Sequence, residues 1–284
     1  MSARVPALRL VLAAMLAAGC SSSSPMLAPV DAPRPSTDSA VVGDGAIIPI
    51  DAPIPIDAPR GGPTITGLGN HALSFNRLTN SMPDLGDLTT IATSPMATAA
   101  SGSTIVVSIG RGALGAFALP TAAPLDNQGN AVYPQLGVTE KYTRWPSGTA
   151  LYALTSARGG TNHTISAATP KGDEVTMAAV EVLGRTKVQD FQWNEVLDGA
   201  HRSKTVTTTG PALLVAFWWG DGFVDAGYTA TPNNGFEVIN AVLEGGSLVQ
   251  CTVAVKSVTA AGTYDVTWAA TPDQGAQLWL VAVQ

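Results

Sequence analysis

One sequence unit occurs twice in this chain, and this repeat constrains the fold more than any other feature of the sequence. Residues 98–112 (TAASGSTIVVSIGRG) align with residues 206–220 (VTTTGPALLVAFWWG) at a spacing of 108. The turn NQG at 127–129 matches NNG at 233–235 at a spacing of 106. GGTNHTISAATP at 159–170 matches AGTYDVTWAATP at 261–272 at a spacing of 102. Because the three matches keep their order, they indicate an internal duplication with six positions lost from loops of the second copy.

Both copies consist of short apolar runs rich in Thr, Val and Ala, separated by turns that contain Gly and Asn. Nine runs have the composition of β-strands: STIVVSI, TALYALT, HTISAAT, EVTMAAVEV, KTVTTT, ALLVAFWW, LVQCTVAV, TYDVTWAA and QLWLVAV. No long window shows the 3.6-residue period of a helix. We therefore predict an all-β fold for residues 64–284, a β-sandwich of jelly-roll type.

The repeat also predicts how the sandwich is divided. The halves span about residues 98–184 and 203–284, and residues 64–97 form a leader with no clear counterpart. A period of roughly 105 residues exceeds that of a solenoid or propeller unit and predicts four or five strands per unit. Two such units can pack as one sandwich or form two tandem immunoglobulin-like domains. No Pro- or Ser-rich linker separates them, which favours one continuous sandwich.

The N-terminus has the layout of an export signal. Residues 1–20 carry Arg4 and Arg9, an uncharged run over residues 10–18 that is too short to span a bilayer, and small residues before Cys20. The sequence AAGC at 17–20 resembles the lipobox of bacterial lipoproteins, although Ala17 stands where Leu is commonest. The resemblance implies a signal peptide over 1–20, lipidation of Cys20 and attachment to a membrane through that lipid. Since Ser21 rather than Asp follows the cysteine, it also implies the outer membrane.

Residues 21–63 are rich in Ser, Pro, Ala and Asp, contain no aromatic residue and include the tandem repeat IPIDAPIPIDAP. Proline fixes φ and removes backbone donors, so such a segment cannot build a packed core. We predict a disordered tether between the lipid and the folded head.

Charge and cysteine content narrow the possible partners. Without Arg4 and Arg9 the mature chain has 13 basic and 21 acidic residues, a net charge of −8. An acidic chain without a basic cluster is unsuited to binding nucleic acid, which requires neutralisation of phosphates. With Cys20 lipidated, Cys251 has no partner for a disulfide, and its apolar surroundings predict a buried, inert thiol.

The duplication offers a test for functional residues, because residues that the fold requires tend to recur in both copies. Asn-x-Gly, Gly-Thr and Thr-Pro recur and are assigned to turns. WWGDGF at 218–223 differs from GRGALG at 110–115. Neighbouring strand residues point to opposite faces, so Trp218 or Trp219 could be exposed. An exposed tryptophan beside polar loop residues can stack on a sugar, which makes a candidate ligand site of Trp218, Trp219, Asp221, Asp225, Asn233 and Asn234; the alternative is that both tryptophans are buried.

The other tryptophans divide by context. Trp145 and Trp193 are weaker candidates for the same role, while Trp268 and Trp279 lie in strong strand patterns and are predicted to be core.

Motifs for catalysis are missing from the sequence. His71, His163 and His201 do not have metal-ligand spacing, and His163 aligns with Asp265 of the other copy. No GxSxG, P-loop, HExxH or CxxC motif is present. Asp190, Glu195 and Asp198 form a local acidic group that is typical of a solvated loop. We expect no enzyme, no cofactor and no metal.

These patterns favour a cell-envelope lipoprotein that displays a non-catalytic binding or adhesion head. The head is similar in composition and strand rhythm to the all-β modules of uncharacterised exported bacterial proteins, and this resemblance implies a glycan or another envelope protein as ligand. A structural component that associates with itself through an exposed strand edge or a large apolar face is the alternative. A glycan-processing enzyme, which would need two acids converging in a cleft, is a third.

Overall fold

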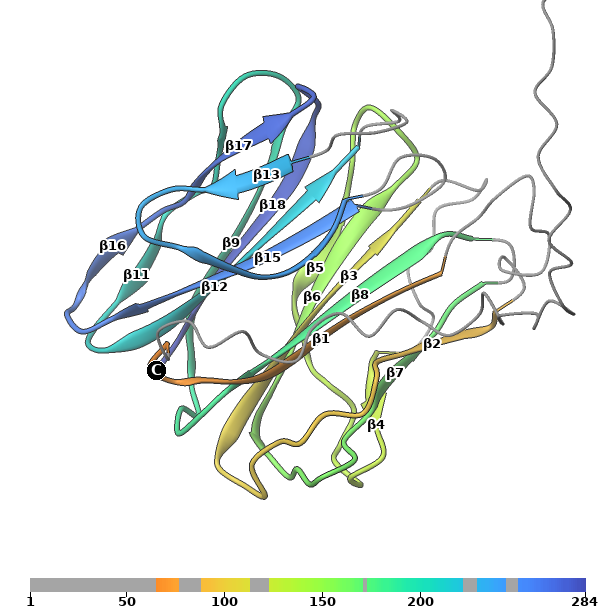
Figure 1. Cartoon of the computed structure of the whole chain (residues 1–284), viewed down its shortest axis with the longest axis vertical. Coiled ribbons are helices and arrows are strands. Elements are labelled where there is room, and N and C mark those ends of the chain that lie inside the picture. The colour runs from red at the N-terminus through yellow and green to blue at the C-terminus, as the bar shows by residue number, and fades with distance from the viewer. Residues whose placement is uncertain (1–64, 77–87, 113–122, 171–172, 222–228, 244–249) are drawn as a thin grey trace, which may run out of the picture. The chain divides into compact units, whose positions relative to one another are not determined.

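The computed structural model describes residues 65–76, 88–112, 123–170, 173–221, 229–243 and 250–284. The predicted signal peptide (1–20), the tether (21–63), Cys20 and Asp225 lie outside these residues. Within them every regular element is a β-strand (Figure 1), so the prediction of an all-β sandwich is confirmed. None of the described residues belongs to a helix with the length and apolar character needed to cross a lipid bilayer.

Each half of the chain contributes one large and one small antiparallel sheet. Large sheet 1 has the order β1-β8-β3-β6-β5 and small sheet 1 the order β2-β7-β4. The strands of the first half are β1 (Leu68–Asn76), β2 (Thr90–Ala92), β3 (Ser103–Arg111), β4 (Leu125–Asp126), β5 (Gln135–Lys141), β6 (Gly148–Ala157), β7 (Ile165–Ala168) and β8 (Val175–Val182).

The second half repeats this order. Large sheet 2 reads β9-β18-β12-β15-β14, small sheet 2 reads β10-β17-β13, and β11 pairs with β16. Its strands are β9 (Val188–Val196), β10 (His201–Arg202), β11 (Val206–Thr208), β12 (Ala212–Gly220), β13 (Thr229–Pro232), β14 (Glu237–Val242), β15 (Gln250–Val258), β16 (Gly262–Tyr264), β17 (Thr267–Thr271) and β18 (Ala276–Val283).

The repeated strand order confirms the duplication and corrects its extent. In the first half the first, eighth, third and sixth strands lie side by side, which is the strand arrangement of a jelly roll, and the second half has the same arrangement when the extra pair β11 and β16 is set aside. Each half is therefore a unit of about eight strands, and the prediction of four or five is wrong. Because β1 and β9 occupy the same place, the repeats begin before residues 98 and 203, and the leader does have a counterpart.

The register of the repeat also differs from the sequence alignment by one residue. Ile109 lies between Met177 and Ala150, as Trp218 lies between Leu278 and Thr252. Trp218 thus corresponds to Ile109, and the spacing in these strands is 109 rather than 108. Since side chains alternate along a strand, a shift of one residue exchanges the two faces of the sheet.

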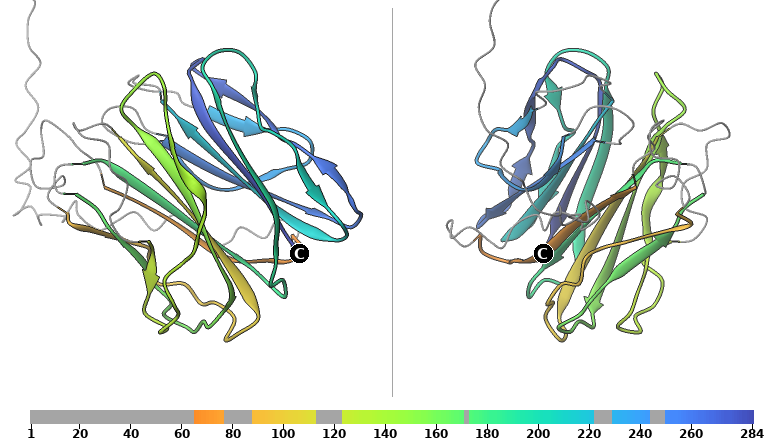
Figure 2. Two further views of the ribbon diagram at one scale, coloured as in Figure 1. Left: turned by 180° about the vertical axis from the view of Figure 1, so that it is seen from behind. Right: turned by 45° about the vertical axis from the view of Figure 1, so that its right-hand side comes forward.

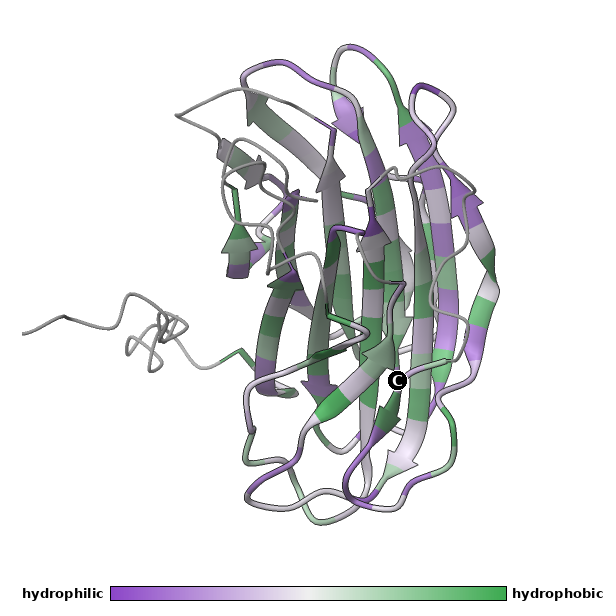
Figure 3. Ribbon diagram, turned by 90° about the vertical axis from the view of Figure 1, so that its right-hand side faces the viewer, coloured by the Kyte–Doolittle hydropathy of each residue, from purple (hydrophilic) through white to green (hydrophobic). Residues whose placement is uncertain are grey.

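The sheets form layers that share three cores. The two large sheets face each other, and the residues between them come from both halves, including Val106, Val180, Val215 and Val281. The opposite face of each large sheet packs on the small sheet of its own half. The structure therefore combines the two alternatives, one continuous sandwich and two tandem domains. Each half has its own core, and a third core joins the halves. Figure 2 shows the yellow and green first half packed beside the teal and blue second half, and Figure 3 shows apolar residues recurring along the strands of both.

In the core between the two large sheets, the second sheet contributes larger side chains than the first. On the second sheet this core contains the aromatic side chains of Phe217, Trp219 and Trp279. Their counterparts on the first sheet, by strand pairing, are Ser108, Gly110 and Ala178. Two of the tryptophans bond across the core: Trp219 Nε1 donates to Ser108 Oγ at 3.2 Å and Trp279 Nε1 to Thr149 Oγ1 at 2.9 Å. The copies differ here because large side chains of one fill the space left by small residues of the other.

The Asn-x-Gly turns have the structural role that the sequence predicts. Asn127 Oδ1 accepts the backbone N–H of Thr164 at 2.9 Å, and Asn233 Oδ1 accepts that of Thr267 at 2.8 Å. The glycine two positions later has a positive φ in both copies, 70° at Gly129 and 74° at Gly235. This backbone conformation favours glycine.

Candidate functional site

A hairpin loop of the first half extends over the second half and joins the two. This junction loop, residues 142–147, connects β5 to β6 and is closed by a hydrogen bond from Tyr142 N to Ser147 O at 2.9 Å. Tyr142 is buried, whereas Trp145 has 55% of its surface exposed and is the most exposed tryptophan among the described residues. The loop therefore presents an indole to solvent from a base that is held in place.

The base is held by Tyr142 and Asp221, the residue that follows β12. The Tyr142 hydroxyl donates to the Asp221 carboxylate, and Asp221 N donates to Gly275 O at 3.1 Å. A Cβ at Gly275 would collide with the Tyr142 hydroxyl, so glycine permits this approach. Burial and the bond to Asp221 raise the pKa of Tyr142. The hydroxyl thus stays protonated and remains a donor.

Two further residues fasten the loop to the end of β9. Glu195 accepts both the backbone N–H of Thr143 at 2.6 Å and its hydroxyl at 2.8 Å. Arg144 donates to Leu197 O at 2.8 Å and lies 3.3 Å from both Asp198 and Asp221. These contacts place Trp145 next to an arginine that bridges two segments of the second half.

The predicted tryptophan pair is not part of an exposed site. Trp218 is fully buried and donates from Nε1 to His201 Nδ1 at 2.9 Å, and Trp219 is only 2% exposed in the core between the large sheets. The hypothesis that one of them faces solvent is wrong, and the alternative that both are buried holds, because both faces of β12 are covered, one by small sheet 2 and the other by large sheet 1. Neither indole can stack on a ligand in this conformation.

The remaining residues of the predicted ligand site do not lie together. Asp221 lies in the junction, and Asp225 is outside the described residues. Asn233 holds the turn to Thr267, and Asn234 donates to Asp265 Oδ1 at 3.0 Å. The asparagines therefore have structural partners and do not meet Trp218 or Trp219 on a common surface.

The other sequence expectations have mixed outcomes. Trp268 and Trp279 are buried, as predicted, and Trp193 is half-buried with its ring centre 6.4 Å from that of Trp279. Asp190 and Glu195 lie within β9 rather than in a solvated loop. Cys251 is buried, as predicted, and its burial raises the pKa of the thiol.

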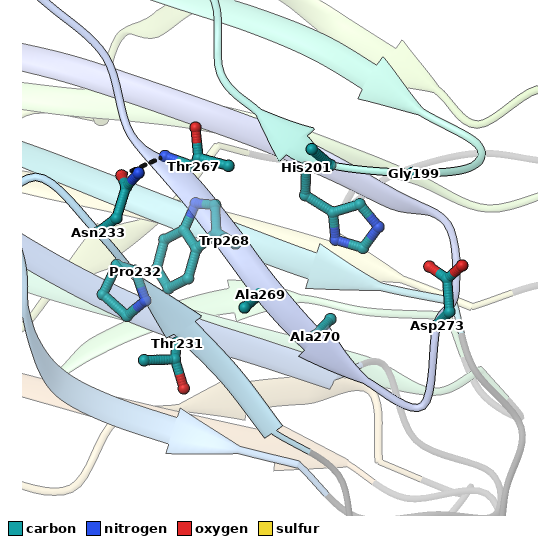
Figure 4. Close-up of a pocket in the computed structure, with 11 residues that line it drawn as sticks. Gly199, His201, Thr231, Pro232, Asn233, Thr267, Trp268, Ala269, Ala270 and Asp273 are labelled. Atoms are coloured by element: carbon teal, nitrogen blue, oxygen red, sulfur yellow. Dashed lines mark hydrogen bonds between the residues drawn. The ribbon is translucent and has the colours of Figure 1, made fainter.

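A groove of about 460 Å³ lies over small sheet 2 (Figure 4). His201 and Asp273 stand at one end, and Asn233, Trp268 and Pro232 at the other. Burial lowers the pKa of His201, opposed by a hydrogen bond with the Gln274 backbone and by the charges of Asp273 and Asp221. Trp268 is only 2% exposed. The groove is thus lined mainly by small residues and exposes almost none of the indole.

A buried polar cluster in the first half has the residue types of a catalytic triad. Thr98 Oγ1 lies 2.8 Å from His163 Nδ1, and His163 Nε2 lies 3.3 Å from Asp126 Oδ2. The Thr98 hydroxyl also accepts the backbone N–H of Gly160 at 3.2 Å, and Thr98 is only 9% exposed. Because this hydroxyl is covered and already bonded, the cluster has the character of a structural network. His163 corresponds by strand pairing to Val266, not to Asp265 as the sequence alignment suggests, since Met96 pairs with His163 as Ser203 does with Val266.

Asp126 is the centre of this network. It accepts from Gln128 N at 2.9 Å, from Asn130 Nδ2 at 2.8 Å and from the Tyr133 hydroxyl at 2.9 Å. Burial acts to raise the pKa of Asp126, but these hydrogen bonds outweigh it and lower the pKa. Among the described residues no group of three or more His, Cys, Asp or Glu side chains is arranged to hold a metal ion.

Sequence reasoning missed most of the junction. Trp145 is visible in YTRWPSG as a weaker candidate, but Tyr142, Thr143 and Arg144 meet partners 52 to 79 positions away in the chain. Such pairs leave no local pattern.

Comparisons with protein-family models, with curated proteins and with solved structures found no significant match for this chain.

Proposed function

We propose that this chain is a lipoprotein of the cell envelope, attached to the outer membrane through lipid on Cys20, whose β-sandwich head is a non-catalytic binding module. The ligand is a glycan or another envelope protein. The observation that supports a binding role is the junction loop, where Trp145 is 55% exposed on a loop fixed by Tyr142, Thr143 and Arg144. Rigid exposed aromatic and Arg side chains contribute disproportionately to binding.

A self-associating structural component has less support. The outer strands of the large sheets are β1, β5, β9 and β14, and the pairing of each has an irregularity in register, such as those between Leu136 and Glu140 and between Val238 and Asn240. Bulges on edge strands disturb the row of backbone groups that another sheet would pair with. An edge-to-edge assembly through these strands is therefore disfavoured.

The anchor is tested by Cys20→Ser. We expect the wild-type chain, expressed with its own N-terminus in a bacterium with two membranes, to fractionate with membranes, and the variant to be exported but soluble. A myristate or palmitate label should enter only the wild type. Equal membrane association of both chains would contradict the lipid anchor.

The binding role is tested by Trp145→Ala in the full chain. We expect this variant to lose an iodide-quenchable component of tryptophan fluorescence and to bind purified envelope fragments about tenfold more weakly. Because the side chain is exposed, its melting temperature should stay that of the wild type. Unchanged binding to every envelope fraction that retains the wild type would argue against the junction loop as the contact.

A further inference from the structure

We infer that the junction loop docks a basic segment of a protein partner, with a lysine side chain lying across Trp145. This inference rests on the proposed function and names the partner of the same site. It follows from which groups of the loop are already bonded and which are available.

The hydrogen-bonding groups at the base of the loop are engaged within the protein. Both carboxylate oxygens of Glu195 accept from Thr143. The Asp221 carboxylate accepts from Tyr142 and Arg144, and its side chain is only 10% exposed. A neutral sugar is recognised through free donors and acceptors around an aromatic ring, and this base offers few of them.

Apolar and acidic groups face solvent beside the partly exposed guanidinium of Arg144. Trp145 is 55% exposed and Leu197 is 38% exposed. The Asp198 side chain is 91% exposed, and its described contact is the 3.3 Å approach of Arg144. Arg144 brings them to one region, since it precedes Trp145 in the chain and contacts both Leu197 and Asp198.

The net negative charge of the junction favours a cationic ligand. The carboxylates of Glu195, Asp198 and Asp221 contact residues 142–144, which carry one cationic side chain, that of Arg144, so the junction has an excess of negative charge. A lysine ammonium is attracted to the face of an indole. Its aliphatic stem can cover apolar surface such as Leu197 while the ammonium stays in water near a carboxylate. A basic peptide thus complements Trp145, Leu197 and Asp198, while Arg144 is paired with Asp198 and Asp221.

The test is a titration of the full chain with an acetylated, amidated tetralysine peptide at low salt, followed by tryptophan fluorescence and calorimetry. We expect saturable binding that quenches the Trp145 component. Asp198→Asn and Trp145→Ala should each weaken it about fivefold or more. Glu237→Gln, which removes an exposed carboxylate on β14, is the matched control and should change affinity less than twofold or so. Affinity should fall as salt rises.

Two other results would overturn the inference. If Asp198→Asn and Glu237→Gln weaken binding equally, the peptide binds only through the overall negative charge of the chain. If instead an uncharged oligosaccharide binds in a Trp145-dependent manner and tetralysine does not, the cationic partner is wrong while the proposed binding role stands. Absence of any Trp145-dependent ligand, including envelope fragments, would count against both.

Discussion

Replacing Trp219 with alanine is expected to lower the free energy of unfolding by about 3–5 kcal/mol, the range for removing a large aromatic side chain from a core. The indole is 2% exposed and belongs to the core between the two large sheets. Its removal leaves a cavity between strands of different halves, and it also deprives Ser108 Oγ of the Trp219 Nε1 donor. Urea denaturation of the full chain, followed by circular dichroism, measures the change as a lower midpoint.

Two control variants separate the contribution of the buried indole from that of its hydrogen bond. Ser108→Ala keeps the indole and removes its hydrogen-bond partner, together with the bond from Ser108 Oγ to Ala150 O at 3.2 Å, so we expect a loss of about 1–3 kcal/mol. Trp145→Ala removes an exposed indole of the same size and should stay within about 0.5 kcal/mol of the wild type. If Trp219→Ala unfolded at the same urea concentration as Trp145→Ala, the two large sheets would not share a core around this residue.

The contrast between these tryptophans shows why the duplication misled the search for a site. A residue that differs between copies is free of the demands common to both, but it can still be required where one copy packs on the other. Trp219 corresponds to Gly110, Phe217 to Ser108 and Trp279 to Ala178, and all six positions face the shared core by their strand pairing. Divergence at these positions reflects complementary packing, which an alignment of the halves does not separate from divergence for function.

The strands of the fold were predictable to the extent that they are buried on both faces. β3, β12 and β18 read as continuous apolar runs and were all recognised from composition. The outer strands β5 and β14 contain polar, exposed positions and a bulge, so they have neither a continuous run nor a clean alternation. These strands, like the short strands β2, β4, β10 and β13, are absent from the nine predicted runs, and the expected unit therefore had fewer strands than the structure shows.

The alignment of the two copies was wrong by one residue for a related reason. In a fully buried strand apolar residues stand at every position, so composition fits either face equally well. Placing β12 one residue out of step against β3 put Trp218 opposite Gly110 instead of Ile109. Only the pairing with neighbouring strands distinguishes these two alignments.

Replacing Asp126 with asparagine is expected to destabilise the protein by about 3 kcal/mol at neutral pH, because hydrogen bonds to a buried charged group are among the strongest in a protein. The carboxylate has no exposed side-chain surface and accepts from Gln128 N, Asn130 and the Tyr133 hydroxyl. An amide of the same shape supplies one acceptor oxygen and directs an N–H₂ group at donors. Thermal and urea unfolding should both report the loss, and Asp198→Asn, an exposed carboxylate on the second half, should be close to neutral.

The pH dependence of the same variant separates loss of charge from loss of shape. Since the pKa of Asp126 is lowered in the folded protein, the carboxylate contributes stability that is present above its unfolded pKa of about 3.9 and is lost as pH falls through the lower, folded pKa. The difference in unfolding free energy between wild type and Asp126→Asn should therefore be constant from pH 8 to about 5 and shrink below about pH 4. A difference that persists undiminished in acid would mean that the geometry of the side chain, and not the charge that Tyr133 and Asn130 stabilise, holds this end of the first half together.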